Sequence, residues 1–174
     1  MLTVFTLPTP LHPAVVHFPI VILLLGAAAA WVMVFRPTGM WPRIAAACFI
    51  LGALGAVAAG QTGEEEAESV KKPWGSKGVR EAHEEWAERT QVAAGVVAVL
   101  AIAVVGVQRW PKVARGIAIV TAVGSLGSTW CVIETGHYGG LLVYRYGMGI
   151  RSAADFPAEK TPADHHRWWR GDDY

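Results

Sequence analysis

Four long apolar stretches dominate this chain and limit what it can fold into. They run from about Ala14 to Phe35, Ile44 to Gly60, Val92 to Val107 and Val113 to Ile133. A helix that crosses a bilayer needs about 20 mostly apolar residues, and a polar helical approach lengthens the third stretch to that size. The sequence therefore predicts an all-α integral membrane protein, folded as a four-helix bundle.

The composition agrees with a membrane protein and argues against a nucleic-acid-binding one. Of the 174 residues, 53% are hydrophobic and 17% are charged, whereas soluble domains carry about 25% charged residues. The formal net charge is +1, and the basic residues are scattered rather than gathered on one element. Cys48 and Cys131 both lie in apolar runs, so we expect two buried thiols rather than a disulfide framework.

One membrane domain is expected over residues 1–150, with an irregular, polar tail over residues 151–174. The predicted helices cover about 14–35, 44–60, 79–107 and 113–134. A long connection over residues 61–89 joins the second apolar stretch to the third. Residues 76–91 are expected to form an amphipathic helical extension at the start of the third helix, capped by Ser76. Glycines over residues 136–150 predict a turn back over the bundle mouth. His165 and His166 in the tail are candidate metal ligands. A solvated or partner-docking segment is the better interpretation of the tail.

The short connections indicate an orientation in the membrane. Residues 36–43 and 108–112 contain Arg and Lys but no Asp or Glu, which is typical of cytoplasmic loops. By alternation, both termini are expected on the periplasmic side of a bacterial inner membrane. No Lys or Arg precedes the first helix, so we expect it to be retained rather than cleaved as a signal peptide. Small residues at four-residue spacing on the second and fourth helices predict close packing within one bundle: Gly52, Ala56, Gly60, Gly124 and Ser128.

Histidines are the residues that suggest chemistry. By this topology His12, His17, His83 and His137 all lie at the periplasmic face. An ionisable group near an apolar helix is a functional candidate, because its burial is costly. His12 and His17 are about 140° apart around a helix, so they cannot bind one metal from the same helix face. His83 continues a stripe with Trp86, Thr90 and Ala94, which predicts that it points into the bundle.

Inward histidines on facing helices favour axial ligation of haem iron. The sequence has no Cys-x-x-Cys-His, which excludes covalent c-type attachment, so we expect one or two haem b groups. One pairing scheme joins His17 to His137 and His12 to His83. Glu64, Glu134 and Tyr138 are candidates for a proton or quinone site near the same face. The expected function is a b-type cytochrome subunit that passes electrons between the quinone pool and a redox partner in a larger complex.

Two other interpretations remain open. Glu134 and His137 form a Glu-x-x-His element as in di-iron bundles, although a second such element is lacking, and a zinc or copper site is a related alternative. The chain is alternatively a non-redox anchor or assembly subunit whose histidines are structural. No nucleophile or phosphate loop is evident, so an electron-transfer subunit fits better than an independent enzyme.

Two segments resemble a known family. Residues 11–20 (LHPAVVHFPI) and 136–150 (GHYGGLLVYRYGMGI) are similar to the bacterial membrane-protein family called domain of unknown function 2231. The resemblance covers roughly residues 10–150. It implies four membrane helices and histidines in both motifs, here His12, His17 and His137. It supplies no settled activity, although members look like redox-partner proteins, so haem binding is expected from the residues alone.

Overall fold

The structure, a computed structural model, describes residues 11–70 and 72–149. Over these ranges the chain forms five helices and no strand: α1 (His12–Val15), α2 (His17–Phe35), α3 (Met40–Ser69), α4 (Lys77–Gly106) and α5 (Pro111–Tyr144). Helices α1 and α2 together form one apolar span, so the described chain contains four spans able to cross a membrane. The predicted all-α membrane bundle is confirmed, and the tail over residues 151–174 lies outside the described residues.

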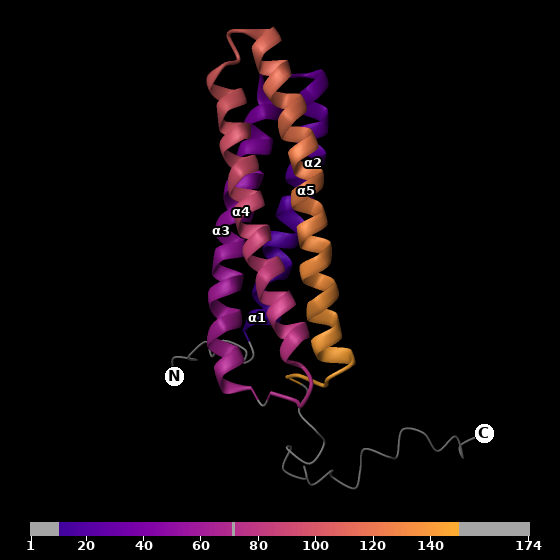
Figure 1. Cartoon of the computed structure of the whole chain (residues 1–174). Coiled ribbons are helices and arrows are strands. Elements are labelled where there is room, and N and C mark those ends of the chain that lie inside the picture. The colour runs from indigo at the N-terminus through magenta and orange to yellow at the C-terminus, as the bar shows by residue number, and fades with distance from the viewer. Residues whose placement is uncertain (1–10, 71, 150–174) are drawn as a thin grey trace, which may run out of the picture.

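The four spans run up and down in sequence order (Figure 1). α2 packs on α3, α3 on α4, α4 on α5, and α5 back on α2, so each span touches its two neighbours. The start of α1, the end of α3, the start of α4 and the end of α5 meet at one end of the bundle. We call this the histidine end. The opposite end, which holds the α2–α3 and α4–α5 turns, is the basic end, named for its arginines and lysine: Arg36, Arg43, Arg109, Lys112 and Arg115.

A proline explains the break between α1 and α2. Pro19 has no backbone N–H, so the carbonyl of Val15 loses the donor that a regular helix would supply. Hydrogen bonding continues on both sides of the break. The Val16 N–H donates to the carbonyl of His12 at 3.1 Å, and the Ile20 N–H donates to that of Val16 at 3.4 Å. The first predicted helix is therefore present, with an interruption near its start.

Small side chains fill the interior and large apolar ones cover the outside. The buried residues include a series of alanines on all four spans: Ala29, Ala30, Ala45, Ala46, Ala94, Ala98, Ala101, Ala114, Ala118 and Ala122. A Cβ on Gly52 would lie 2.5 Å from Cδ2 of Leu23, so these helices approach too closely for any side chain there. The small residues thus pack inside one bundle, as predicted. Leu25, Leu54 and Val99 are exposed on the outside, as suits a surface in lipid.

The helices are longer than the sequence predicted at the histidine end. α3 continues past Gly60 to Ser69, and α5 continues past residue 134 to Tyr144. Residues 61–69 of the predicted connection over 61–89 and residues 136–144 of the predicted turn over 136–150 are therefore helical instead. Residues 77–89 are helical as predicted for the extension of the third helix. Each glycine in a helix costs about 1 kcal/mol, and packing against other helices outweighs that cost here. The chain turns only at Gly147 and Gly149, whose φ angles are 64° and 78°.

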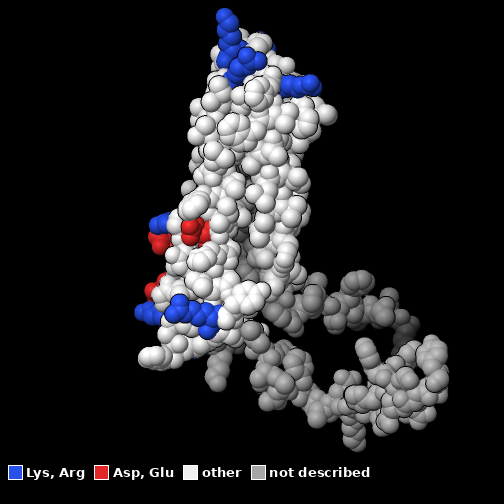
Figure 2. Space-filling model, turned by 90° about the vertical axis from the view of Figure 1, so that its right-hand side faces the viewer, with Lys and Arg blue, Asp and Glu red and all other residues white. Residues whose placement is uncertain are grey.

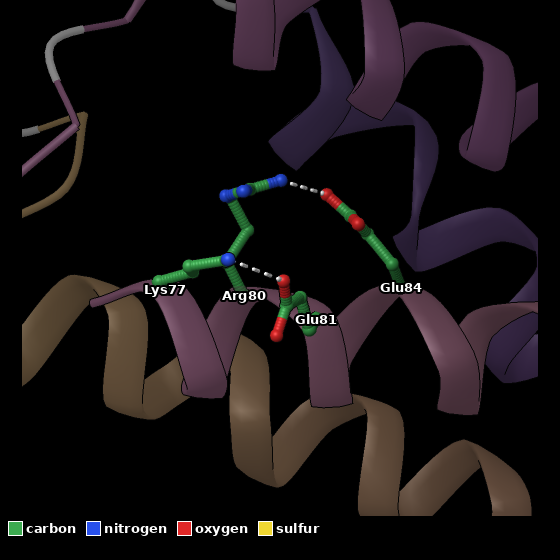
Figure 3. A network of polar contacts seen from close by, with 4 residues as sticks. All are labelled: Lys77, Arg80, Glu81 and Glu84. Atoms are coloured by element: carbon green, nitrogen blue, oxygen red, sulfur yellow. Dashed lines mark hydrogen bonds and ion pairs between the residues drawn. The ribbon is translucent and has the colours of Figure 1, made fainter. Parts of the chain in front are cut away.

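The first part of α4 is charged and projects from the apolar part of the bundle. Figure 3 shows Arg80 bonded to Glu84 at 2.7 Å and Lys77 beside Glu81 at 3.7 Å. Arg89 and Glu85 form the next i,i+4 pair at 2.5 Å. From Arg89 to its end at Gly106, α4 rises by about 26 Å, which is close to the thickness of a hydrocarbon core. Residues before Arg89 therefore lie outside the membrane-spanning part of α4.

Ser76 does not act as the predicted cap of α4. It precedes the helix, but its hydroxyl donates to the carbonyl of Pro73 at 2.7 Å and makes no capping bond to α4. Gly75, with φ 80°, turns the chain into the helix immediately before it. The serine hydroxyl therefore stabilises the turn over residues 73–76 rather than the first amides of α4.

Candidate functional site

His12 and His83 lie against each other at the histidine end. His12 is the first residue of α1 and His83 is the seventh of α4, and both are half-buried. Their ring centres are 6.4 Å apart and their planes are perpendicular. Of the two pairings considered from the sequence, this is the one that the structure brings into contact.

The His12 ring is held by α3. Its Nδ1 lies 2.8 Å from the carbonyl oxygen of Ala59 and 3.4 Å from the hydroxyl of Thr62. That hydroxyl donates to the same carbonyl at 3.0 Å. A Cβ on Gly63 would lie 2.9 Å from Cε1 of the ring. The imidazole can therefore rest against the α3 backbone only because residue 63 has no side chain.

The His83 ring is held by α5 in the same way. Its Nδ1 lies 2.9 Å from the carbonyl oxygen of Thr135, and a Cβ on Gly139 would lie 3.1 Å from its Cε1. In both cases the ring bonds to the carbonyl of one residue and lies over the glycine four residues later. The two helix hairpins, α2–α3 and α4–α5, thus repeat one local design around the two histidines.

The carbonyl bonds determine which ring nitrogen carries the proton. A carbonyl oxygen only accepts, so Nδ1 of each ring is the donor, and in a neutral imidazole Nε2 then keeps its lone pair. Within residues 11–70 and 72–149, Nε2 of neither ring makes a hydrogen bond. This is the arrangement of metal-binding histidines, whose second nitrogen usually donates to a carbonyl or carboxylate.

His83 is also biased toward its neutral form. It lies outside the membrane-spanning part of α4, yet burial lowers its pKa below the usual value of 6.5. The neighbouring His12 lowers the pKa further, whereas the Thr135 carbonyl and Glu84 act in the opposite direction. A neutral imidazole is the form that binds a metal.

Two threonine hydroxyls join α4 to α5 on the membrane side of His83. Oγ1 of Thr90 and Oγ1 of Thr135 are 3.0 Å apart. Each also reaches a carbonyl of its own helix, Trp86 at 2.9 Å and Cys131 at 2.8 Å. Thr90 is almost completely buried, and so is Ala94 beyond it, so the predicted inward stripe of α4 is confirmed. The hydroxyl pair fixes the two helices that carry and hold His83.

Glu66 was not singled out from the sequence, although it supports the site. Its carboxylate accepts hydrogen bonds from the backbone N–H groups of Leu11 and of His12, the latter at 2.9 Å. It therefore fastens the start of α1 to α3. The α3 residues that contact His12 share one face of the helix, because Thr62 and Gly63 are three and four residues after Ala59 and four and three before Glu66. This spacing is the signal that could have revealed them.

His17 and His137 do not join the pair. His17 is exposed rather than directed into the bundle, and its Nδ1 lies 2.6 Å from the carbonyl oxygen of Pro13 in the preceding turn. His137 is also exposed, with its ring centre 5.3 Å from that of Tyr138. No ring contact links His17 to His137 in the described part of the chain.

The carboxylates considered from the sequence do not assemble around a metal. Glu64 is exposed on α3, and Glu134 and Tyr138 are half-buried on α5. Among residues 11–70 and 72–149, no group of three or more His, Cys, Asp or Glu side chains converges as a metal site would require. Cys48 and Cys131 are free thiols. His165 and His166 lie outside the described residues.

The sequence model of a family described as "Predicted membrane protein (DUF2231)" matches residues 8–152, which is most of the chain. The chain belongs to this family. The resemblance drawn from residues 11–20 and 136–150 is confirmed, and the DUF2231 match includes both histidines of the contact pair and the helices that hold them. No curated protein and no solved structure matches the chain.

Proposed function

We propose that this DUF2231 protein is a membrane-bound b-type cytochrome subunit in which His12 and His83 would hold one haem. The observation that carries the proposal is their contact, with ring centres 6.4 Å apart and neither Nε2 bonded within the described chain. Two imidazoles that bind one metal from opposite sides place their ring centres about 6 Å apart, because each metal–nitrogen bond is about 2 Å.

The number of converging ligands favours haem over a bare metal ion. Zinc sites take three or four protein ligands, whereas haem iron takes four ligands from the porphyrin and needs two from the protein. In the described residues two histidines converge and no group of three does. This supports haem b over the zinc, copper and di-iron alternatives.

The chain's own contribution is to hold two neutral rings in fixed orientations. The carbonyls of Ala59 and Thr135 keep Nδ1 protonated, and Gly63 and Gly139 leave room for the rings. Hydrogen bonds of this kind also raise the basicity of the ligand nitrogen. A bound haem would supply one-electron chemistry at this position.

The position of the site supports electron transfer at the periplasmic face of a bacterial inner membrane. Arg and Lys gather at the basic end, which by the positive-inside rule is cytoplasmic, so the histidine end and both termini would be periplasmic. The protein would then pass electrons between the quinone pool and a redox partner in a larger complex. Glu64, Glu134 and Tyr138, on α3 and α5 near this end, are the residues from which a quinone or proton site would be built.

A reduced-minus-oxidised optical spectrum of the full chain, purified after haem-replete expression, tests the proposal. We expect the sharp bands of a six-coordinate b-type haem and one haem per chain. Purified protein without these bands would overturn it. Elemental analysis then separates the alternatives: stoichiometric zinc, copper or iron without porphyrin would indicate a metal site. No metal, with histidine variants that only impair assembly, would indicate a non-redox anchor.

A further inference from the structure

The basic end is a strongly cationic surface. Figure 2 shows blue atoms at this end and no red ones, while red and blue mix toward the histidine end. All five cations of the basic end are exposed. The nine glutamates of residues 11–70 and 72–149 all lie on the other side of the apolar band, from Glu64 to Glu88 and at Glu134. The basic end therefore lacks carboxylates of its own in the described chain.

Three of these cations gather at the α4–α5 turn. Arg109, Lys112 and Arg115 lie within seven residues, and Lys112 and Arg115 share one face of the first turns of α5. The guanidinium of Arg109 lies over the ring of Trp110, 3.8 Å from its centre. The ion pairs found in the described chain are all on the charged part of α4 at the opposite end. These three cations are thus available to an external anion.

The start of α5 adds backbone donors to the same place. Pro111 opens the helix, no side chain caps it, and its first turn contains no acidic residue. The first amide of α5 with a helical partner is that of Ala114, which donates to the carbonyl of Trp110 at 2.9 Å. The N–H groups of Lys112 and Val113 therefore point out of the helix, beside the cations, at the positive end of the helix dipole.

We propose that the α4–α5 turn binds the phosphate group of an anionic membrane phospholipid. Cationic side chains and helix N-terminal amides together form the usual protein environment of a phosphate. The surface below the turn suits the rest of a lipid. Val113 and Val120 are exposed, and Gly116 between them has no atom within 4 Å of a Cβ built on it. Acyl chains can lie along this open apolar strip, whereas a free phosphate would make no use of it.

The α2–α3 turn provides a natural comparison. It has only Arg36 and Arg43, and the amide of Gly39 at the start of α3 already donates to the side chain of Gln108 at 3.0 Å. The amide of Trp110, the corresponding residue before α5, is likewise bonded, to the carbonyl of Val107 at 2.8 Å. The two turns therefore share one membrane face and differ in the number of cations. A specific site at the α4–α5 turn predicts that they differ in lipid binding, whereas a diffuse charge effect predicts that they do not.

Native mass spectrometry of the full chain in detergent tests this, with phosphatidylglycerol and phosphatidylcholine of the same acyl chains as probes. We expect phosphatidylglycerol to bind at least tenfold more tightly. A cation near the membrane surface contributes about 1 kcal/mol, or roughly fivefold. The double variant Arg109→Gln/Lys112→Gln should therefore bind phosphatidylglycerol about 25-fold more weakly, and Lys112→Gln alone about fivefold more weakly.

The matched control is Arg36→Gln/Arg43→Gln, which should change the affinity by less than fivefold. Equal losses in the two double variants would overturn the assignment in favour of diffuse attraction. Equal binding of both lipids by the unchanged protein would overturn anion recognition itself. Millimolar inorganic phosphate should leave the phosphatidylglycerol bound. Displacement of the lipid by an equal concentration of phosphate would overturn the assignment of the site to a lipid. Gel filtration and helical circular dichroism confirm that the variants are folded.

Discussion

The rings of His12 and His83 lie with their centres 6.4 Å apart and their planes perpendicular, and each ring is anchored to the second long helix of its own hairpin. Both anchors are backbone carbonyls, so side-chain substitution at Ala59 or Thr135 does not remove them. The orientation of the rings depends instead on how closely the helices of each hairpin pack. Ligand geometry and bundle packing are therefore coupled, and the carbonyl hydrogen bond of each ring fixes its tautomer.

The contact pair predicts which histidines affect a bound haem. His12→Ala and His83→Ala should each lower the haem-to-protein ratio more than tenfold, because each removes one of two axial ligands. His17→Ala and His137→Ala should leave the ratio and the optical bands unchanged, because both side chains are exposed. The ratio is measured from the pyridine haemochrome spectrum of equal amounts of purified protein. Loss of haem in His137→Ala with retention in His83→Ala would contradict the assignment.

The glycines beneath the rings predict a steric effect. Gly63→Ala places a Cβ 2.9 Å from Cε1 of His12, and Gly139→Ala places one 3.1 Å from Cε1 of His83. We expect each to lower the free energy of unfolding by about 1–3 kcal/mol, as overpacking usually does, with Gly63→Ala the more severe. Thermal unfolding in detergent measures the change.

Two other glycines of α5 serve as controls for that experiment. Gly127 and Gly136 have no atom within 4 Å of an added Cβ. Alanine at either position should be neutral or stabilise the helix by up to about 1 kcal/mol, because alanine has the higher helix propensity. Destabilisation by Gly136→Ala equal to that by Gly139→Ala would show that the ring contact is not the cause.

The sequence predicted the fold well because membrane helices are encoded by long, local features. Four apolar stretches, short basic turns and small residues such as Gly52 and Ala56 were sufficient to predict an antiparallel four-helix bundle. The inward stripe of α4 was also predictable, since a three- or four-residue period continues from Ala94 back to His83. These signals depend on neighbouring residues only.

The ends of α3 and α5, and with them the site, depended on contacts distant in sequence. Glycine favours turns locally, so residues 136–150 predicted a turn, whereas Gly139 is helical and packs on His83. Residues 61–89 were predicted as a connection, whereas Glu66 lies in α3 and bonds to the start of α1. His17 is exposed, with its Nδ1 2.6 Å from the carbonyl oxygen of Pro13 in the preceding turn, whereas its apolar neighbours predicted an inward ligand.

Glu66 should stabilise the start of α1. Glu66→Ala leaves the backbone N–H groups of Leu11 and His12 without this acceptor. Hydrogen bonds to a charged group contribute about 1.5–3 kcal/mol, so we expect a destabilisation of about that size. Glu65→Ala is the matched control, because Glu65 is exposed, and its effect should stay within about 0.5 kcal/mol. Thermal unfolding of both variants in the same detergent measures the two effects. Equal destabilisation by Glu66→Ala and Glu65→Ala would contradict the stabilising role of Glu66.

The hydroxyl contact between Thr90 and Thr135 predicts a measurable coupling between α4 and α5. Thr90→Val and Thr135→Val keep the side-chain shape and remove the hydroxyls, which are 3.0 Å apart. Polar contacts between membrane helices contribute about 0.6 kcal/mol on average and up to about 1.7 kcal/mol. We expect the double-mutant cycle, measured by unfolding in detergent, to give a coupling in this range. Thr121 supplies the control, since its hydroxyl donates to the carbonyl of Ile117 on its own helix at 2.8 Å.

Thr121→Val combined with Thr135→Val should be additive, because the two hydroxyls have no common partner. Thr135→Val should also leave the optical bands of a bound haem unchanged, because His83 is anchored by the backbone carbonyl of Thr135 and not by its hydroxyl. A coupling near zero for Thr90 and Thr135 would mean that each hydroxyl bonds only within its own helix. Changed haem bands with normal coupling would instead mean that the hydroxyl, rather than the carbonyl, sets the orientation of the His83 ring.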